Sequence, residues 1–491
     1  MKRVRILLLF SILSITCINN DPPDQILTGH NPRVQKLDSL VNIYNGIYEP
    51  AGFAVGVVEQ DQFIYAKGFG YKNIEQKKPI TANTVFHLAS ISKSFAAVAV
   101  MQLAEKNQLD LDLPLTTYLP YFRLDDPRYQ KITLRHILTH RSGIPDVEDE
   151  EDYEWENPQY DSLAVEQFVK NLSDRKLKFN PGEKRLYSNF AYDILADVIL
   201  KVSGVSFETY MQRFVFNPIK MQHTTFLKDQ VPLKLQAFPH VIDTRNFHHR
   251  VSSIYPYNRI HAASSTLHSN LLDMGKYAIA TLKGYHQDNQ VLTKASYQAL
   301  WTEELGWPTG SFRKHKTVWS SGSDIGFQSY FILLPEDSLG VIVLSNCERL
   351  PCQALAKDIL DILLDINPPE LKNPASRVFM QHLSQSGING AIQQLGYLME
   401  NEKHNYRFDM GEIWFLGWRA IQQENYELAI EINKFFIAAS PQNPLSFYAL
   451  AKAYMKKGEP ELAIEYFNRL LETDPDHRRA KIYLQHLTQA L

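Results

Sequence analysis

This chain lacks the compositional signatures of several protein classes. Cysteine is scarce, with 3 among 491 residues: Cys347 and Cys352 could pair in an oxidising compartment or be two buried thiols, and they give little support to a metal site. Neither sign of charge dominates, since 51 basic residues face 54 acidic ones and no long basic stripe follows the N-terminus. A nucleic-acid partner is therefore not expected. The apolar run at residues 6–15 is too short to span a bilayer comfortably.

Residues 1–17 have the shape of a secretory signal peptide. Basic residues precede the apolar run, and Cys17 stands where a bacterial lipoprotein would be cleaved and lipidated. Two alternatives remain open, a lipid-anchored protein and a freely secreted one. Both place the chain outside the cytoplasm, as a periplasmic protein or a membrane-anchored lipoprotein of a bacterium, with residues 18–32 as a linker.

The length of 491 residues predicts two or three domains, and 44% hydrophobic residues are enough for ordinary cores. Strand patterns occur near both ends of the first 367 residues, with helical patterns between them. This arrangement predicts one sheet built from distant parts of the chain, and therefore an α+β domain over residues 33–367. The expected elements are a helix at 34–44, a hairpin at 53–73, a helix at 189–202, strands at 317–322, 326–335 and 340–346, and a helix at 353–364.

Beyond residue 367 the patterns are helical only. Segments 416–441 and 450–475 superimpose at a period of 34, with small residues and a terminal proline at matching places. This is the tetratricopeptide pattern, and it predicts an all-α domain over residues 370–491. An unrelated helical bundle remains the alternative. The repeats could bind a protein or an extended peptide in their groove, or simply pack on the preceding domain.

Ser90 lies three residues before Lys93, where an amphipathic helix is expected to begin. Positions i and i+3 share a helix face, so the hydroxyl and the amine can point into one cleft. Serine needs a base within hydrogen-bond reach, and a lysine can serve when burial and the positive helix end keep its amine uncharged. The alternative is a capping serine followed by a solvated lysine. Ser173 and Lys176 have the same spacing without any other catalytic sign.

Four segments in order, at 69–95, 132–146, 180–199 and 322–346, resemble the serine hydrolases related to class C β-lactamases, penicillin-binding D-alanyl peptidases and esterases. The resemblance covers roughly residues 33–365. It implies a β-lactamase/transpeptidase-like fold, in which an antiparallel sheet with flanking helices adjoins an all-helical subdomain. It also implies a set of site residues that needs neither a cofactor nor a metal. Ser90 would be the acylated nucleophile and Lys93 its proton partner. Tyr187 would share the general-base role and later protonate the leaving group, and Asn189 would hold the substrate carbonyl or the lysine by hydrogen bonds.

The third motif of the resembling family is a lysine or histidine, any residue, then glycine. Here the matching positions are Ser320, Ser321 and Gly322, so a serine stands where a basic side chain is usual. The absence of a basic side chain at this position removes a charge-assisted contact of about 1.5–3 kcal/mol to a substrate carboxylate. We therefore expect a substrate without that carboxylate, or a weakened enzyme. The backbone N–H groups of Ser90 and Ser323 match the oxyanion hole of the family.

Two further patterns are given structural interpretations. The acidic run at 146–156 is expected to be a solvated surface loop. His136 and His140 have metal-ligand spacing but no HExxH arrangement.

Taken together, these patterns favour an exported serine hydrolase acting on an ester or amide, such as a D-amino-acid peptide, an ester or a β-lactam-like compound. The alternative is a catalytically weak protein that binds partners through its repeats.

Overall fold

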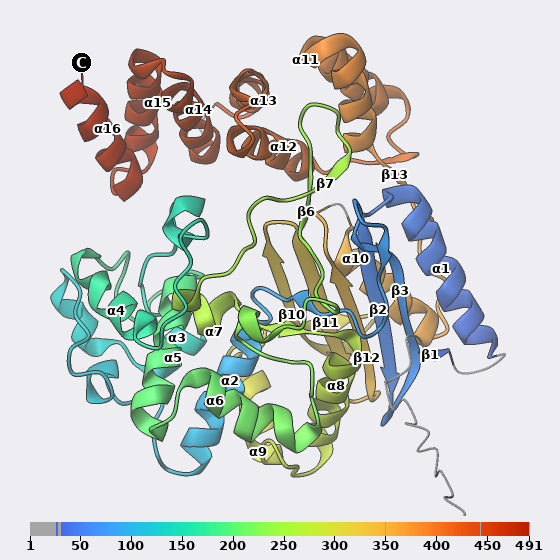
Figure 1. Cartoon of the computed structure of the whole chain (residues 1–491), viewed down its shortest axis with the longest axis vertical. Helices are drawn as coiled ribbons and strands as arrows, with labels where there is room; N and C mark the ends of the chain where they lie inside the picture. Colours follow the sequence, from blue (N-terminus) through green and yellow to red (C-terminus); the bar gives the residue numbers. More distant parts are fainter. Residues whose placement is uncertain (1–25, 28–30, 349, 442, 491) are drawn as a thin grey trace, which may run out of the picture.

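An antiparallel sheet assembled from two distant parts of the chain forms the centre of the larger domain (Figure 1). The computed structural model describes residues 26–27, 31–348, 350–441 and 443–490, so the expected signal peptide and Cys17 lie outside the described residues. In spatial order the strands are β1 (Ile26–Leu27), β3 (Gln62–Asn73), β2 (Gly52–Glu59), β12 (Leu339–Ser345), β11 (Phe327–Leu334), β10 (His315–Asp324) and β9 (Thr309–Phe312), with β4 (Lys78–Pro79) paired to β3. The early hairpin and the late strands therefore meet where β2 pairs with β12.

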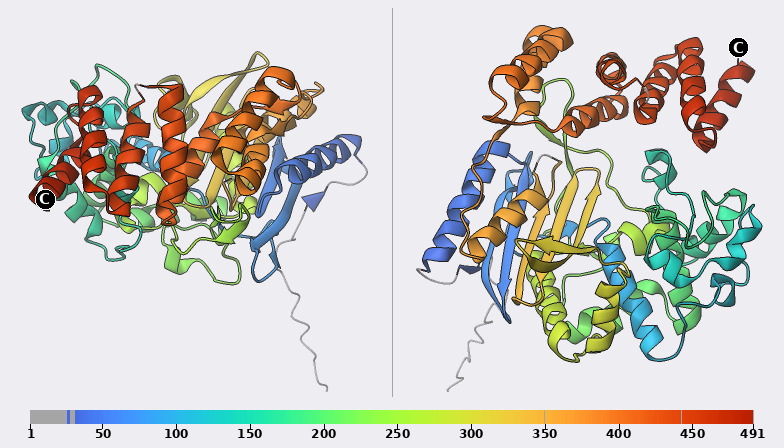
Figure 2. Two further views of the ribbon diagram at one scale, coloured as in Figure 1. Left: turned by 90° about the horizontal axis from the view of Figure 1, so that it is seen from above. Right: turned by 180° about the vertical axis from the view of Figure 1, so that it is seen from behind.

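Both faces of the sheet are covered by helices. Along β12, Val341 and Val343 join the core under α1 (Pro32–Tyr48) and α10 (Cys352–Leu363), which lie together on one face (Figure 2, right). The intervening Ile342 belongs to the opposite core, with α2 (Ser92–Glu105) and α8 (Leu271–His286). Successive strand residues point to opposite faces, so a sheet buried on both sides needs continuous apolar strands such as these.

The all-helical subdomain lies on the α2 side of the sheet. Helix α2 is buried along nearly its whole length and packs against α5 (Asn189–Ser203). The Ser188 hydroxyl accepts a hydrogen bond from the backbone N–H of Ala191 and caps α5, and Gly204 ends the helix with φ of 76°. The cap fixes Asn189 at the first turn of α5, and the expected helix at 189–202 is confirmed. The other helices of the subdomain are α3 (Leu134–Leu138), α4 (Ala164–Asn171), α6 (Phe207–Met211), α7 (Ala262–Ser265) and α9 (Lys294–Thr302).

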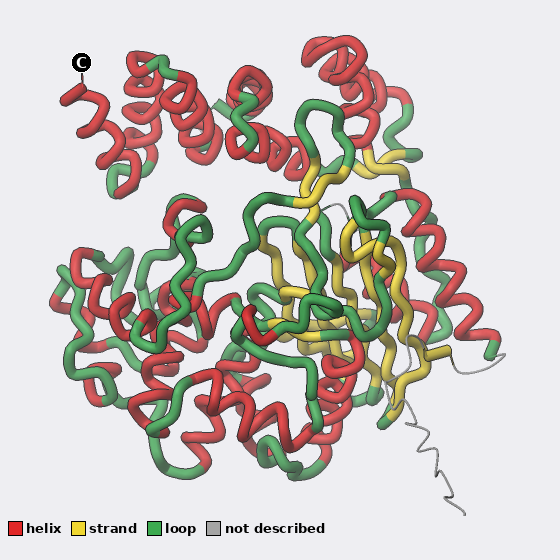
Figure 3. Tube along the Cα trace, viewed as in Figure 1, coloured by secondary structure: helices red, strands yellow, loops and turns green. Residues whose placement is uncertain are grey.

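The C-terminal part consists of helices after the short strands β13 (Asn373–Pro374) and β14 (Tyr406–Arg407), which flank α11 (Ala375–Asn401) (Figure 3). The starts of the later helices repeat at the predicted period, because 410, 444 and 478 are each 34 apart, as are 426 and 460. These helices are α12 (Met410–Gln422), α13 (Tyr426–Ala439), α14 (Pro444–Lys457), α15 (Pro460–Thr473) and α16 (Arg478–Ala490). The tetratricopeptide region predicted from the sequence is present. None of the helices that the structure describes combines the length and apolarity needed to cross a membrane.

Two regions correct or resolve sequence expectations. The acidic run at 146–156 is only partly a solvated loop: Glu154 and Glu156 are exposed, but Asp149 and Asp152 are buried and pack against α14 and α16. Composition alone could not reveal this, because the compensating cations lie about 300 residues later in the chain. Cys347 and Cys352 are both free and buried, so they form no disulfide with each other.

Candidate active site

Ser90 and Lys93 converge at the start of α2. Ser90 lies in the turn before the helix, rather than inside it, because Ala89 takes a left-handed φ of 48° and α2 begins at Ser92. The Lys93 Nζ donates hydrogen bonds to Ser90 Oγ at 3.0 Å, Asn189 Oδ1 at 2.6 Å and the backbone oxygen of Ser264 at 2.8 Å. Lys93 is only 4% exposed. An uncharged amine could keep the two bonds to fixed acceptors and turn its lone pair to the serine.

Tyr187 approaches Ser90 from the loop before α5. Its hydroxyl donates to Ser90 Oγ at 2.8 Å, and its ring centroid lies 4.9 Å from Lys93 Nζ. The ring stacks on His140, with centroids 4.4 Å apart. Burial, reinforced by the charges of Lys93 and Arg185, lowers the pKa of His140 to about 3. His140 is therefore uncharged near neutral pH, and it supports the phenol ring without adding a cation to the site.

Asn189 links the lysine to the loop that follows α3. Its backbone N–H donates to Asp146 Oδ1 at 2.7 Å, and its Nδ2 donates to Asp146 Oδ2 at 3.2 Å and to the Tyr153 hydroxyl at 3.0 Å. Because both acceptors hold the amide nitrogen, the amide oxygen faces Lys93. Asp146 and Tyr153 were missed in the sequence, where neither stands at an informative spacing from Asn189.

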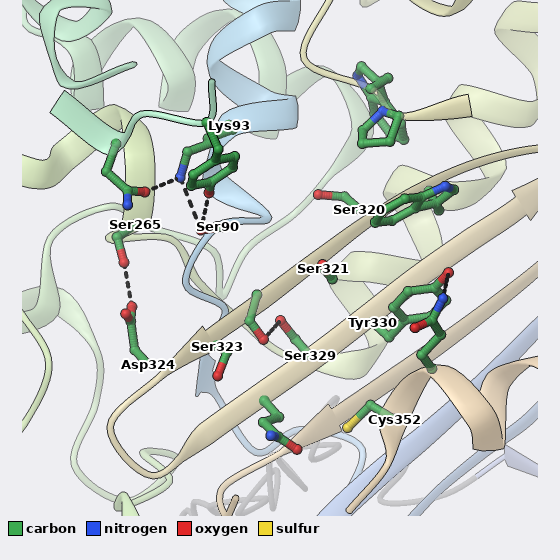
Figure 4. Close-up of a pocket in the computed structure, with 18 of the residues that line it drawn as sticks. Ser90, Lys93, Ser265, Ser320, Ser321, Ser323, Asp324, Ser329, Tyr330 and Cys352 are labelled. Carbon is green, nitrogen blue, oxygen red and sulfur yellow. Dashed lines mark hydrogen bonds between the residues drawn. The ribbon is translucent and has the colours of Figure 1, made fainter. Parts of the chain in front are cut away.

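Strand β10 forms the opposite wall of the site. Figure 4 shows Ser320, Ser321 and Ser323 along this strand, with Ser90 and Lys93 across the cleft. A Cβ atom on Gly322 would lie 2.1 Å from the backbone oxygen of Leu88 and 3.0 Å from the Ser90 nitrogen. The missing side chain therefore lets β10 approach the backbone of Ser90 at the position directly before Ser323.

Asp324 fixes the end of β10, directly after Ser323. Its Oδ2 lies 2.7 Å from the buried Nε2 of His87 and accepts a hydrogen bond from the Ser265 hydroxyl (Figure 4). His87 comes from β5 (Phe86–His87), three residues before Ser90. The cluster ties β10 to the segment that carries the nucleophile. The sequence carries no local signal for this cluster, because its residues are distant in the chain.

The cleft around Ser90 has a volume of about 850 Å³ and is lined by uncharged polar, apolar and charged side chains. Among the described lining residues the cations are Lys93, Arg185 and Arg407. Arg407 is already paired with Asp409 and Glu412, whereas Arg185 is exposed and forms no ion pair with a described residue. Besides Ser90, Tyr153 and Tyr187, the hydroxyl groups of the cleft come from Ser265, Ser320, Ser321, Ser323, Ser329 and Tyr330 (Figure 4). The described residues contain no group of three or more His, Cys, Asp or Glu side chains suited to a metal ion.

A sheet flanked by helices, with a serine, a lysine and a tyrosine meeting at the edge of a helical subdomain, has the architecture of the β-lactamase and penicillin-binding class of serine hydrolases. A family model described as beta-lactamase matches residues 37–363, and the chain belongs to this family. A tetratricopeptide repeat model matches residues 420–486. The resemblance drawn from the sequence is thereby confirmed.

Individual relatives support the same assignment. Protein flp of Staphylococcus aureus is 23% identical over 326 residues, which cover 64% of this chain and 64% of that protein. The match therefore spans just under two thirds of that relative. Penicillin-binding protein 4* of Bacillus subtilis is 36% identical over 171 residues, or 34% of this chain and 36% of that protein. The solved structure of the octameric penicillin-binding protein homologue from Pyrococcus abyssi matches this chain with a TM-score of 0.60 and 27% identity. The match covers 70% of this chain and 81% of the homologue's chain.

Proposed function

We propose that this protein is an exported serine hydrolase that cleaves an ester or amide through an acyl-enzyme on Ser90. The observation that carries the proposal is the contact of a buried lysine and a cleft-facing tyrosine with one serine oxygen, at 3.0 Å and 2.8 Å. Positioned proton-transfer groups of this kind contribute about 10²–10⁴-fold to rate.

The geometry supports a consistent sequence of proton transfers. In the fraction of molecules in which its amine has a free lone pair, Lys93 takes the hydroxyl proton of Ser90, whose oxygen forms a bond to the substrate carbonyl carbon. The backbone N–H groups of Ser90 and Ser323 hold the negative charge that develops on the carbonyl oxygen. Tyr187 then gives a proton to the leaving group as its bond to carbon breaks, and Lys93 returns the proton to the tyrosine. Water attacks the acyl-enzyme by the same route in reverse and restores the free serine.

The character of the cleft supports a substrate that is polar but carries no carboxylate at the β10 wall. Ser320 leaves that wall without the basic group usual in the family, and Ser321 and Ser323 add hydroxyl groups along the same strand. Esters and D-amino-acid amides fit this description better than penicillins do. A screen of chromogenic esters, D-amino-acid amides and a cephalosporin would identify the class, and preferred turnover of the cephalosporin would contradict this assignment.

The chain itself offers a matched control for the nucleophile. A fluorophosphonate probe should label the wild-type protein and the Ser173→Ala variant, but not Ser90→Ala. Ser173 has the same spacing from a lysine as Ser90, yet it is exposed and outside the cleft. Equal labelling of the wild type and Ser90→Ala would remove Ser90 as the nucleophile.

Export is proposed from the N-terminal sequence, with Cys17 as the site of lipid attachment. Radiolabelled palmitate should enter the wild-type protein in a bacterial host and be lost in Cys17→Ser, which should appear in the soluble periplasmic fraction. Recovery of the wild-type protein from the cytoplasmic fraction, with its N-terminal residues still attached, would contradict export.

A further inference from the structure

The helical repeats hold a segment of their own chain. The acidic segment, defined here as residues 148–152, contacts the face of the repeats formed by α14 and α16, which lie above the helical subdomain at the upper left of Figure 1. At its centre both oxygens of Asp149 accept hydrogen bonds from Lys452 Nζ at 2.6 Å, and the Tyr448 hydroxyl also donates to Asp149. The side chains of Asp149 and Lys452 are 0% and 6% exposed. Lys452 Nζ also lies 3.2 Å from Glu151 Oε1. Loss of the Lys452 charge would leave Asp149 buried without its ionic partner.

The flanking carboxylates have partners on the same face. Arg479 donates from its backbone nitrogen to Glu148 Oε2 at 2.8 Å and from Nε to Asp152 Oδ1 at 2.8 Å. The Tyr483 hydroxyl donates to Glu151 at 2.8 Å. Although burial alone would raise the pKa of Glu151, the charge of Lys452 and the bond from Tyr483 lower it to about 2. Consecutive carboxylates repel one another, so the conformation of the acidic segment depends on these cations and donors.

The same segment ends at the catalytic residues. Tyr153 follows it directly, and its hydroxyl accepts the Nδ2 hydrogen bond of Asn189, whose oxygen holds Lys93. The Tyr153 ring stacks on Trp155 with centroids 4.5 Å apart, and Asn258 Nδ2 donates to the backbone oxygen of Tyr153 at 3.2 Å. The segment is thus fixed by the repeats in its middle and by the catalytic domain at its end.

We propose that the C-terminal repeats are a working part of the active site, because they hold the acidic segment so that Tyr153 orients the amide of Asn189 toward Lys93. Tyr153 is a positioning residue, and Lys452 and Arg479 act through it. This inference rests on the proposed function. Under this proposal, the face of the repeats formed by α14 and α16 binds the acidic segment of the same chain, whereas the sequence had left open a separate peptide partner.

The test compares four variants with the full-length wild type. Lys452→Met removes the charge that faces Asp149, Lys452→Arg keeps it, and Tyr153→Phe removes only the hydroxyl that faces Asn189. Lys457→Met is the control, because Lys457 pairs with Glu427 and Glu459 and does not contact the acidic segment. Each variant is assayed for kcat and KM on a 4-nitrophenyl ester and for its rate of fluorophosphonate labelling. Circular dichroism melting establishes which variants are folded at the assay temperature.

We expect Lys452→Met to lose about tenfold or more in kcat with KM nearly unchanged, since a shift of 1.4 kcal/mol in the barrier gives tenfold in rate. Lys452→Arg should recover most of the loss, and Lys457→Met should match the wild type. Tyr153→Phe should lose about 2- to 10-fold in kcat, the effect of one hydrogen bond. Wild-type kcat in both Tyr153→Phe and a folded Lys452→Met would overturn the proposal. If Lys452→Met does not fold, the kcat of Tyr153→Phe decides alone. Absence of labelling in the wild type would instead refute the proposed function.

Discussion

The approach of β10 to the nucleophile depends on a single absent side chain, which makes Gly322→Ala the sharpest test of the site geometry. The added methyl carbon would lie 2.1 Å from the backbone oxygen of Leu88 and 2.7 Å from the Ser329 hydroxyl. Ser329 can rotate, but the peptide of Leu88 is two residues from Ser90 and cannot move without it. Restoring a contact of even 3.0 Å requires a displacement of about 1 Å between β10 and the Ser90 segment.

This displacement has a predictable cost. A misplacement of about 1 Å in a catalytic group can lower the rate on the order of 100-fold, because the oxyanion donors no longer meet the developing charge. Overpacking of this kind also destabilises a fold by about 1–3 kcal/mol. We therefore expect Gly322→Ala to stay folded, to melt a few degrees lower, and to react with a fluorophosphonate about 100-fold more slowly than the wild type.

The control is Gly310→Ala on the neighbouring strand β9, where the nearest atom to an added Cβ is Thr317 Oγ1 at 3.5 Å. This variant should label at the wild-type rate. Labelling rates are measured at a fixed probe concentration by quenching and in-gel fluorescence, with melting followed by circular dichroism. A wild-type rate in Gly322→Ala would refute the argument that the close contact between β10 and Ser90 builds the oxyanion site.

Three further predictions concern other groups of the site. Ser320→His should restore a basic group at the β10 wall and lower KM for carboxylate-bearing substrates about 10-fold or more; an unchanged KM in steady-state assays would contradict our account of this position. Tyr187→Phe should keep the ring stack on His140 but lower kcat by about 10²–10⁴-fold, and a smaller loss would limit the tyrosine to a structural role. Burial lowers the pKa of His140 to about 3, so between pH 6.5 and 3 the unfolded chain binds a proton that the folded chain does not. The contribution of this group to the free energy of unfolding is therefore constant above pH 6.5 and falls with acidification by up to about 1.4 kcal/mol per pH unit. Urea titrations at pH 7 and pH 5 should show a smaller loss of unfolding free energy in His140→Gln than in the wild type, and equal losses would rule out this contribution.

Local patterns in the sequence were sufficient for much of the architecture. The spacing of Ser90 and Lys93 brought the two groups together within one turn, because positions three apart on a helical turn are adjacent whatever surrounds them. The hairpin at 53–73 and the late strands were readable from apolar runs, and the repeat period of 34 predicted where the C-terminal helices begin. The exact start of the helix was not readable: α2 begins at Ser92, after Ser90, because the left-handed residue Ala89 sets a turn there.

The amino-acid sequence by itself therefore predicted the pairing of Ser90 with its neighbouring amine, the elements that carry them and the helical array. Only the tertiary structure decided which groups surround them. The partners of Asn189 lie 36 and 43 residues away in sequence, at Tyr153 and Asp146, and the acidic segment meets Lys452 303 residues after Asp149. Contacts of this kind leave no periodic trace, because nothing in the local backbone geometry relates the two positions. A run of carboxylates has the same composition whether water solvates it or facing cations neutralise it. Which of the two occurs depends on how the domains pack.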